Sequence, residues 1–179
     1  CAASVLAIVS VFGFASISWQ VVERRDCLEG KGGGYMIRKA AGTDRQTVAS
    51  LMVQLWPQHS REEMMHEIDE LIRTPGNEVF LAFVQGEPVG FAQCGLRYDH
   101  VEGTNSCPVG YLEGIFVKAQ YRRRGIASQL LNRCEDWAKE KGCTEFGSDC
   151  ALSNRESASF HLESGFEEAD RIVCFVKKL

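Results

Sequence analysis

The sequence predicts an α/β domain in which a mixed, twisted β-sheet carries helices on both of its faces. The apolar runs 79–84 and 89–96 flank the turn Gln85-Gly86-Glu87-Pro88, a pattern typical of an antiparallel hairpin. The apolar runs 109–117 and 145–149 are separated by one long helical pattern, which is typical of a crossover between parallel strands. Together the two patterns predict a sheet with both kinds of strand pairing.

The first half of the predicted domain holds a strand, two helices and the hairpin. Tyr35–Lys39 is expected to form a short strand. Asp44–Leu55 is expected to form a helix because its apolar residues recur at helical spacing. Ser60 and Glu63 stand three positions apart, as in a capping box, and predict that a second helix begins there and ends before Pro75.

The second half is expected to alternate strands and helices. Glycines follow both of its helical patterns, as is typical of helix C-termini. The expected elements are, in order, a polar loop at 98–108, the long central strand at 109–117, a helix at 125–141, a strand at 145–149, a helix at 154–164 and a last strand at 166–176.

Composition argues against several classes of function. The net charge is −4 at pH 7, so nucleic acid is not expected as a partner and any basic cluster must be local. The eight cysteines form no CxxC pair and the four histidines stand at no zinc-finger spacing, so no metal site is expected. Cys94, Cys134, Cys150 and Cys174 fall in predicted strands or helices, where a reduced cysteine acts as a small apolar residue. We therefore expect a reducing, cytoplasmic location.

Residues 1–35 differ from the rest of the chain. The stretch up to Val22 holds no charged residue, but its apolar run is borderline in length for a membrane anchor, which needs about 20 apolar residues. No basic region precedes this run, as a signal peptide requires, and a glycine-rich stretch follows it. We interpret residues 1–35 as an incidental flank with a linker, with a functional anchor as the alternative, and residues 36–179 as the domain.

A basic turn, Arg122-Arg123-Arg124-Gly125, lies between the predicted central strand and the following helix. Gly125 lets the backbone approach a ligand closely, and the free N–H groups of a helix N-terminus favour negative charge. Three arginines add strong donors for phosphate. Most charge runs are simply solvated, but the order strand, basic turn, helix predicts a site for a phosphate-rich ligand.

Two carboxylates predict a second, cationic ligand. Glu113 stands inside an apolar strand, where an unpaired charge is costly, and strict alternation would place it on one face with Ile115 and Val117. Asp149 ends the neighbouring parallel strand, and ligands of open α/β sheets gather at the carboxyl ends of strands. Both carboxylates are therefore expected to flank one cleft. Taken alone, an acid at a strand end is more often a helix cap or a surface charge.

With these pieces in order, the chain resembles the GCN5-related N-acetyltransferase (GNAT) superfamily. Arg122-x-x-Gly125-x-Ala127 fits the acetyl-CoA motif of that family, and Asn154 and Gly165-Phe166 follow at matching places. The resemblance covers about residues 36–176 and implies the GNAT fold with acetyl-CoA as co-substrate. It implies that backbone groups bind acetyl-CoA at Ile115, Phe116, Val117, Arg123, Arg124, Gly125, Ile126, Ala127 and Ser128, with Asn154 as a further contact.

A narrower resemblance is to the aminoglycoside 6′-N-acetyltransferases. It is carried by Leu55-Trp56-Pro57-x-His59, by Arg97-x-Asp99-x-Val101-x-Gly103 and by Leu112-Glu113-Gly114-Ile115-Phe116-Val117. It implies a homodimer and a drug-binding site formed by Trp56, His59, His100, Glu113, Asp149 and Asp170.

The expected activity is acetyl transfer from acetyl-CoA to the 6′-amine of an aminoglycoside, which confers resistance. Asp149 would accept the proton of the amine, and Glu113 would hold a second ammonium or a water. The alternatives are an acetyltransferase for another cationic amine, such as a polyamine or a protein N-terminus, and a non-catalytic acyl-CoA-binding module. One departure is His161, which stands where many family members have a tyrosine that protonates the leaving thiolate; His161 or water could serve here.

Overall fold

The computed structural model describes residues 28–29 and 34–178 of the chain. The expected flank and linker at 1–35 therefore lie almost wholly outside the described residues. Two residues of that segment, Leu28 and Glu29, form a short strand, β1, that pairs with the first strand of the domain. In the part of the chain that is described, no helix is long and apolar enough to span a bilayer.

The predicted mixed sheet is confirmed. Within residues 28–29 and 34–178 it has six strands, which lie side by side in the order of the chain: β1 (Leu28–Glu29), β2 (Tyr35–Lys39), β3 (Asn77–Val84), β4 (Glu87–Arg97), β5 (Val109–Val117) and β6 (Phe146–Ser148). The pairs from β1 to β5 are antiparallel, and β5 pairs with β6 in parallel. The parallel pair follows from the crossover helix that the sequence predicts between 117 and 145.

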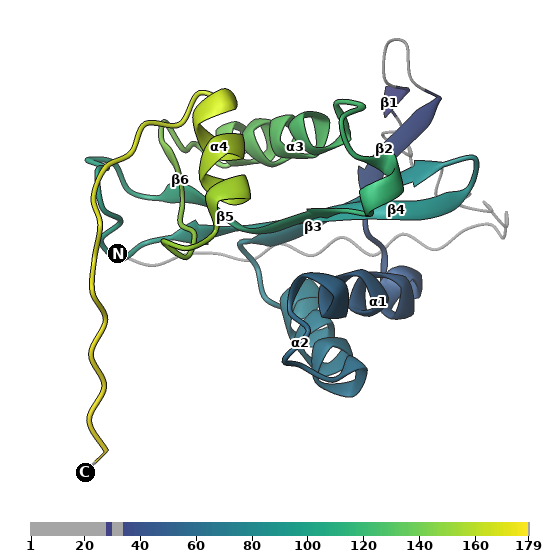
Figure 1. Ribbon diagram of the computed structural model, residues 1–179, viewed down its shortest axis with the longest axis horizontal. Coiled ribbons are helices and arrows are strands. Elements are labelled where there is room, and N and C mark those ends of the chain that lie inside the picture. Colours follow the sequence, from purple (N-terminus) through teal and green to yellow (C-terminus); the bar gives the residue numbers. More distant parts are fainter. Residues whose placement is uncertain (1–27, 30–33, 179) are drawn as a thin grey trace, which may run out of the picture.

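Helices cover both faces of this sheet, as the sequence predicts. Figure 1 shows α1 (Arg45–Leu55) and α2 (Arg61–Arg73) below the sheet and α3 (Ile126–Glu140) and α4 (Arg155–Glu163) above it. Two short 3₁₀ helices, η1 (Gly42–Asp44) and η2 (Ala119–Tyr121), precede α1 and the basic turn. Each face has its own apolar core, one beneath α3 and one beneath α1 and α2. The sheet is therefore buried on both sides. β5, the expected central strand, lies second from one edge, between β4 and the short edge strand β6.

The predicted capping box at the start of α2 is confirmed. The Ser60 hydroxyl accepts the N–H of Glu63 at 3.2 Å, and the Glu63 carboxylate accepts the N–H of Ser60 at 2.8 Å. These bonds satisfy two N–H groups at the N-terminus of the helix, and they fix where α2 begins.

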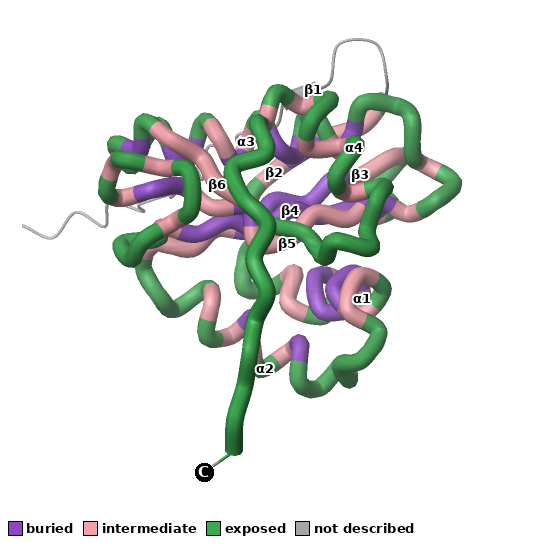
Figure 2. The backbone as a smooth tube through the Cα atoms, turned by 60° about the vertical axis from the view of Figure 1, so that its left-hand side comes forward, coloured by how far each residue is buried: buried purple, intermediate pink, exposed green. Residues whose placement is uncertain are grey.

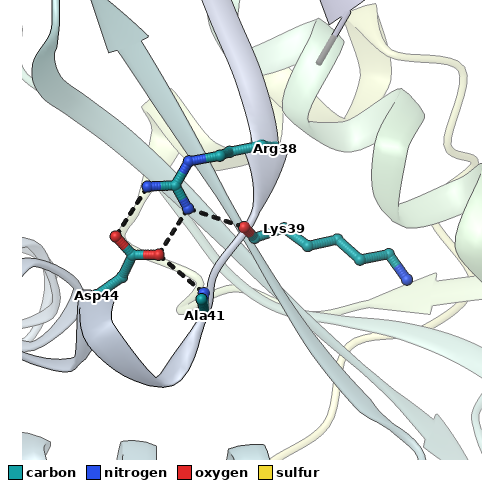
Figure 3. Close-up of polar contacts among 4 residues, drawn as sticks. All are labelled: Arg38, Lys39, Ala41 and Asp44. Carbon is teal, nitrogen blue, oxygen red and sulfur yellow. Dashed lines mark hydrogen bonds and ion pairs between the residues drawn. The ribbon is translucent and has the colours of Figure 1, made fainter. Parts of the chain in front are cut away.

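A partly buried ion pair between Arg38 and Asp44 fixes the connection between β2 and α1 (Figure 3). The guanidinium of Arg38 donates to both oxygens of Asp44, at 2.6 and 2.8 Å, and the N–H of Ala41 donates to the same carboxylate at 2.8 Å. The bonds from Arg38, helped by that from Ala41, lower the pKa of Asp44 below its ordinary value of 3.8, although partial burial opposes them.

Replacing Asp44 by asparagine should lower the free energy of unfolding at pH 7 by about 1–2 kcal/mol, because charged hydrogen bonds are lost. Since the pKa of Asp44 is lowered on folding, its contribution is present above pH 3.8 and is lost as the pH falls below that value. Urea unfolding of Asp44→Asn and of the surface control Asp136→Asn between pH 7 and 3 measures this. A loss for Asp44→Asn that stays constant with pH would contradict it.

The prediction of a last strand at Phe166–Val176 is wrong for the single chain. No strand is present after α4 in the described residues, and the segment runs away from the sheet as an exposed tail (Figure 2). Its apolar residues are exposed: Ile172 by 71%, Val173 by 76%, Phe175 by 93% and Val176 by 97%. Strand-forming residues make a strand only when a neighbouring edge pairs with them, and no such edge meets them here.

The expectation for the cysteines holds for two of the four. Cys94 in β4 and Cys134 in α3 are buried in the core beneath α3, as small apolar residues. Cys150 follows β6 and Cys174 lies on the tail, and both are exposed outside any helix or strand, so that part of the prediction is wrong. Burial raises the pKa of the Cys134 thiol well above its ordinary value, which keeps this thiol unreactive.

Candidate functional site

A bulge in the middle of β5 forms the centre of the candidate site. β4 and β5 pair in register up to Leu112 and again from Gly114, which leaves Glu113 as the extra residue. The expectation that Glu113 shares a face with Ile115 and Val117 is wrong, because the bulge interrupts the alternation. Leu112, Ile115 and Val117 all pack into the core beneath α3. Glu113 turns away from that core toward the side chain that ends β4.

That side chain is Arg97, which forms a two-pronged ion pair with Glu113. Its Nε donates to Oε1 at 3.0 Å and its Nη2 to Oε2 at 2.8 Å. The bonds to Glu113 raise the pKa of Arg97 further above its ordinary value. A cationic ligand that reaches Glu113 must therefore share this carboxylate with a cation that the protein itself supplies.

Tyr111 connects this pair to Asp149. The guanidinium carbon of Arg97 lies 4.4 Å from the centre of the Tyr111 ring, a cation–π contact. The Tyr111 hydroxyl donates to Oδ1 of Asp149 at 2.5 Å. Burial of the ring, and then this bond, raise the pKa of Tyr111 well above its ordinary value of 10.0, so the phenol stays protonated and able to donate. The two predicted carboxylates thus belong to one connected group, Glu113–Arg97–Tyr111–Asp149.

Trp56 lies against the same stretch of β5. It follows the last residue of α1, and a Cβ atom placed on Gly114 would lie 2.7 Å from its indole ring. Only glycine therefore lets the ring approach the strand next to Glu113. The ring also packs against Phe91, with 6.1 Å between the ring centres. A half-buried indole beside Glu113 offers an apolar wall to a ligand held by that carboxylate.

The other predicted drug-binding residues lie on exposed segments. The contacts of His59 and His100 are local: His59 lies 3.8 Å from Glu63, and His100 lies 3.4 Å from Glu102. Asp170 accepts the N–H of Arg171, its own neighbour. Among the described residues, no contact joins these three to the Glu113–Asp149 group. Ala169 packs on Gly103, which brings the chain beside Asp170 next to the loop that carries His100.

The far half of β5 has one open edge. β6 pairs only with Gly110, Tyr111 and Leu112, whereas β4 continues alongside β5 to Val117. Beyond Leu112, the edge of β5 that faces away from β4 has no ladder partner in the described residues. Within the predicted site for acetyl and pantetheine, the backbone groups of Ile115 and Val117 point to that edge, where Arg122 binds the Val117 carbonyl. The Phe116 carbonyl lies instead against Gly90 of β4.

The basic turn follows the same end of β5. Arg123 and Gly125 both have left-handed backbone angles, with φ of 60° and 76°. No side chain caps α3, and the first helical bond is donated by the Gln129 N–H to the Gly125 carbonyl at 3.1 Å. The N–H groups before Gln129, those of Ile126, Ala127 and Ser128, thus precede the first helical bond. Left-handed residues followed by free helical N–H groups form a concave anion site.

Not all of the arginines in this turn face a ligand. Arg122 donates from Nε to the Val117 carbonyl at 3.1 Å and pairs through Nη1 with Glu156 at 2.8 Å. It thereby ties the end of β5 to the first turn of α4. Asn154 lies at that same end of α4, where its side-chain oxygen accepts the N–H of Ser157 at 3.1 Å. The predicted CoA contact Asn154 thus stands two residues before Glu156, the partner of Arg122.

His161 braces α4 against the sheet. Its Nδ1 lies 2.7 Å from the Ser157 carbonyl and its Nε2 lies 2.9 Å from the Ser148 hydroxyl, which itself donates to the Leu112 carbonyl at 3.1 Å. Both ring nitrogens are thus engaged within the protein. This arrangement favours a structural role for His161 over proton donation to a leaving thiolate.

Two residues of the site were missed by sequence reasoning. Arg97 stands in a matched motif, but nothing in its spacing indicates that it pairs with Glu113, sixteen positions later. Tyr111 stands in an apolar strand where a tyrosine is an ordinary residue. The available signal was the spacing of Tyr111 and Glu113, two positions apart on one strand, whereas the register that places Gly147 opposite Tyr111 is visible only in the structure.

Comparisons with known proteins agree with this arrangement. Residues 45–166 match the family model described as Acetyltransferase (GNAT) family. The chain is 39% identical over 131 residues to an aminoglycoside N(6′)-acetyltransferase type 1 of Serratia marcescens, which covers 73% of this chain and 90% of that protein.

Solved structures give the same result. A structure of AAC(6′)-Iy in complex with the bisubstrate analog CoA-S-monomethyl-acetylneamine has a TM-score of 0.78 and 35% identity, and the match covers 81% of this chain and 99% of that one. A structure of AAC(6′)-Ih from Acinetobacter baumannii has a TM-score of 0.77 and 37% identity, covering 82% and 99%. The chain therefore belongs to the acetyltransferase (GNAT) family, within its group of aminoglycoside 6′-N-acetyltransferases.

Proposed function

We propose that this enzyme transfers the acetyl group of acetyl-CoA to the 6′-amine of an aminoglycoside antibiotic and thereby confers resistance. The observation that carries the proposal is the arrangement along β5. A concave anion site follows the end of the strand, its far half has an open edge, and two carboxylates and an indole surround its bulge. The anion site suits the phosphates of a CoA thioester, and the carboxylates suit a polycationic amine, so both substrates can bind along one strand.

The coenzyme side is assigned to backbone groups. The N–H groups of Arg123 to Ser128 bind the pyrophosphate of CoA, and Asn154 adds a contact from α4. The open edge of β5, through the backbone groups of Ile115 and Val117, pairs with the pantetheine arm and directs the thioester toward the bulge. Backbone donors at a left-handed turn and a helix N-terminus suit phosphate oxygens, which supports this assignment.

The acceptor side is assigned to side chains. Trp56 and Glu113 hold the drug, the carboxylate facing an ammonium, and the exposed His59, His100 and Asp170 extend the site outward. Asp149 orients the 6′-amine and accepts its proton, directly or through a water.

The chemical step is direct attack in a ternary complex. The amine nitrogen forms a bond to the thioester carbonyl carbon, while the N–H of Val117 stabilises the developing oxyanion. The carbon–sulfur bond then breaks, the sulfur leaves with the electron pair, and Asp149 takes the proton from nitrogen. Because both nitrogens of His161 are engaged, water protonates the thiolate.

A thiol-release assay with acetyl-CoA tests the function. Turnover is expected with kanamycin-type drugs that carry a 6′-amine and not with an analogue that carries a 6′-hydroxyl. Spermidine and peptides in the same panel test the acetyltransferase alternatives. If only spermidine is acetylated, the substrate is a polyamine and not the drug. If no amine is acetylated, the non-catalytic acyl-CoA-binding module is favoured.

We also propose that the enzyme is a homodimer joined by its C-terminal tail. The tail carries the strand pattern and four exposed apolar residues, Ile172, Val173, Phe175 and Val176. In the described part of the chain, the outer edge of β6 pairs with no strand. If the tail of one copy pairs with β6 of another, the apolar side chains of the tail become buried and the free backbone groups at the edge of β6 become hydrogen-bonded.

The double substitution Val173→Asp/Phe175→Asp should convert the protein from a dimer to a monomer, because charges replace apolar side chains that the partner would bury. Sedimentation velocity is expected to give a mass about twice 19.9 kDa for the wild type and 19.9 kDa for the variant. Lys178→Glu, which changes charge without removing apolar surface, is the control and should remain dimeric. A wild type that sediments at 19.9 kDa would contradict the proposal.

A cytoplasmic location is proposed with the enzyme. It is supported by the free state of Cys94, Cys107, Cys134, Cys143, Cys150 and Cys174, since unpaired thiols, three of them exposed, are typical of a reducing compartment.

A further inference from the structure

Two neighbours lie against the ring of Tyr111 in the site. The guanidinium of Arg97 lies 4.4 Å from the ring centre. A Cβ added to Gly147 would lie 3.2 Å from the nearest ring atom. Gly147 is the register partner of Tyr111 in the parallel pair β5–β6. The ring therefore lies across β6, and its hydroxyl reaches Asp149, two residues beyond Gly147.

The contact with Asp149 is directional. Asp149 follows the last residue of β6 and is exposed, so no packing of its own fixes the rotation of its carboxylate. The bond from the Tyr111 hydroxyl to Oδ1 is the hydrogen bond that the structure gives to this side chain. With Oδ1 engaged, Oδ2 is left to face the acceptor.

We propose that Tyr111, held by Arg97 and Gly147, is a positioning residue that fixes Asp149 for proton transfer from the acceptor amine. This rests on the proposed role of Asp149. Tyr111 does not itself exchange a proton with the substrate, because its phenol is the donor to Asp149. Positioning matters for rate because a small misplacement of a reacting group lowers catalysis far more than it lowers binding.

The role also explains why Arg97 pairs with Glu113. The pair fixes the guanidinium in the plane from which it contacts the Tyr111 ring. One cation therefore both compensates the charge of Glu113 and supports the residue that orients Asp149. The two carboxylates of the site are thereby held in a fixed relation before the drug arrives.

The test is a double-mutant cycle between Tyr111→Phe and Asp149→Asn, measured by thiol release with a 6′-amine drug. Tyr111→Phe is expected to lower kcat about 10-fold and to leave the KM values of drug and acetyl-CoA within about twofold. In the Asp149→Asn background, Tyr111→Phe is expected to have no further effect, since it acts through Asp149. Gly147→Ala adds a Cβ 3.2 Å from the ring and 3.0 Å from Val101, leaves the Tyr111 and Asp149 side chains unchanged, and should lower kcat to a similar extent.

Tyr121→Phe is the matched control. It also removes a tyrosine–carboxylate bond, from Tyr121 to Glu87 at 2.8 Å, beside a stacked arginine, Arg124. Its kcat at saturating acetyl-CoA should stay within about twofold of the wild type. Thermal unfolding of every variant verifies that the fold is retained.

The possible results separate the proposals. If the wild type is active and Tyr111→Phe keeps its kcat, the positioning role is wrong while the enzyme function stands. If the 10-fold loss persists in the Asp149→Asn background, Tyr111 does not act through Asp149, and the proposal is overturned. If the wild type acetylates no 6′-amine, the proposed function itself fails, and the positioning role fails with it.

Discussion

Asp149→Asn is expected to lower kcat by about 10² or more, because an amide cannot accept the proton that the acceptor amine must lose. The substitution keeps the shape of the side chain, and the Tyr111 hydroxyl can still donate to the remaining oxygen. The KM of acetyl-CoA should therefore stay within about twofold of the wild-type value, since the coenzyme contacts at the basic turn and β5 are separate from Asp149.

Steady-state kinetics with a 6′-amine drug at saturating acetyl-CoA measures this effect. Asp136→Asn, at an exposed position on α3 where the carboxylate pairs with Lys139, removes one negative charge outside the Glu113–Asp149 group and should leave kcat within about twofold of the wild type. An Asp149→Asn enzyme with wild-type kcat would show that another group or the solvent receives the proton.

Elements with strong local signals could be predicted from the sequence. The sequence predicts β5 with its observed bounds, Val109–Val117, because a long apolar run between a polar loop and a basic turn is typical of a buried strand. The start of α2 was predicted from Ser60 and Glu63, because a capping box is a contact within four residues. The basic turn was predictable for the same reason, since its geometry depends on neighbours along the chain.

Features set by pairing between distant residues could not be predicted. The bulge at Glu113 depends on the register between β4 and β5, and it reverses which side chains share a face after Leu112. The Tyr111–Asp149 bond depends on the register between β5 and β6. The tail shows a different limit. Its sequence is typical of a strand, but a strand needs a partner strand, and the tail pairs with none in the described residues.

Glu113→Gln is expected to raise the KM of the drug about 10-fold or more, a larger change than the loss of one ordinary hydrogen bond. Two effects act in the same direction. The drug loses a carboxylate that can face its ammonium, and Arg97 loses the partner that compensates its charge. An uncompensated guanidinium beside the bulge then repels a polycationic ligand, while the coenzyme contacts further along β5 are unaffected.

The double variant Arg97→Gln/Glu113→Gln separates these two effects. Removing the guanidinium as well should recover part of the lost affinity, so its drug KM is expected to lie below that of Glu113→Gln and above that of the wild type. Its kcat should nevertheless fall, because Arg97 no longer supports the Tyr111 ring. A Glu113→Gln enzyme with wild-type drug KM would contradict both effects, and other groups of the site would then hold the drug's cation.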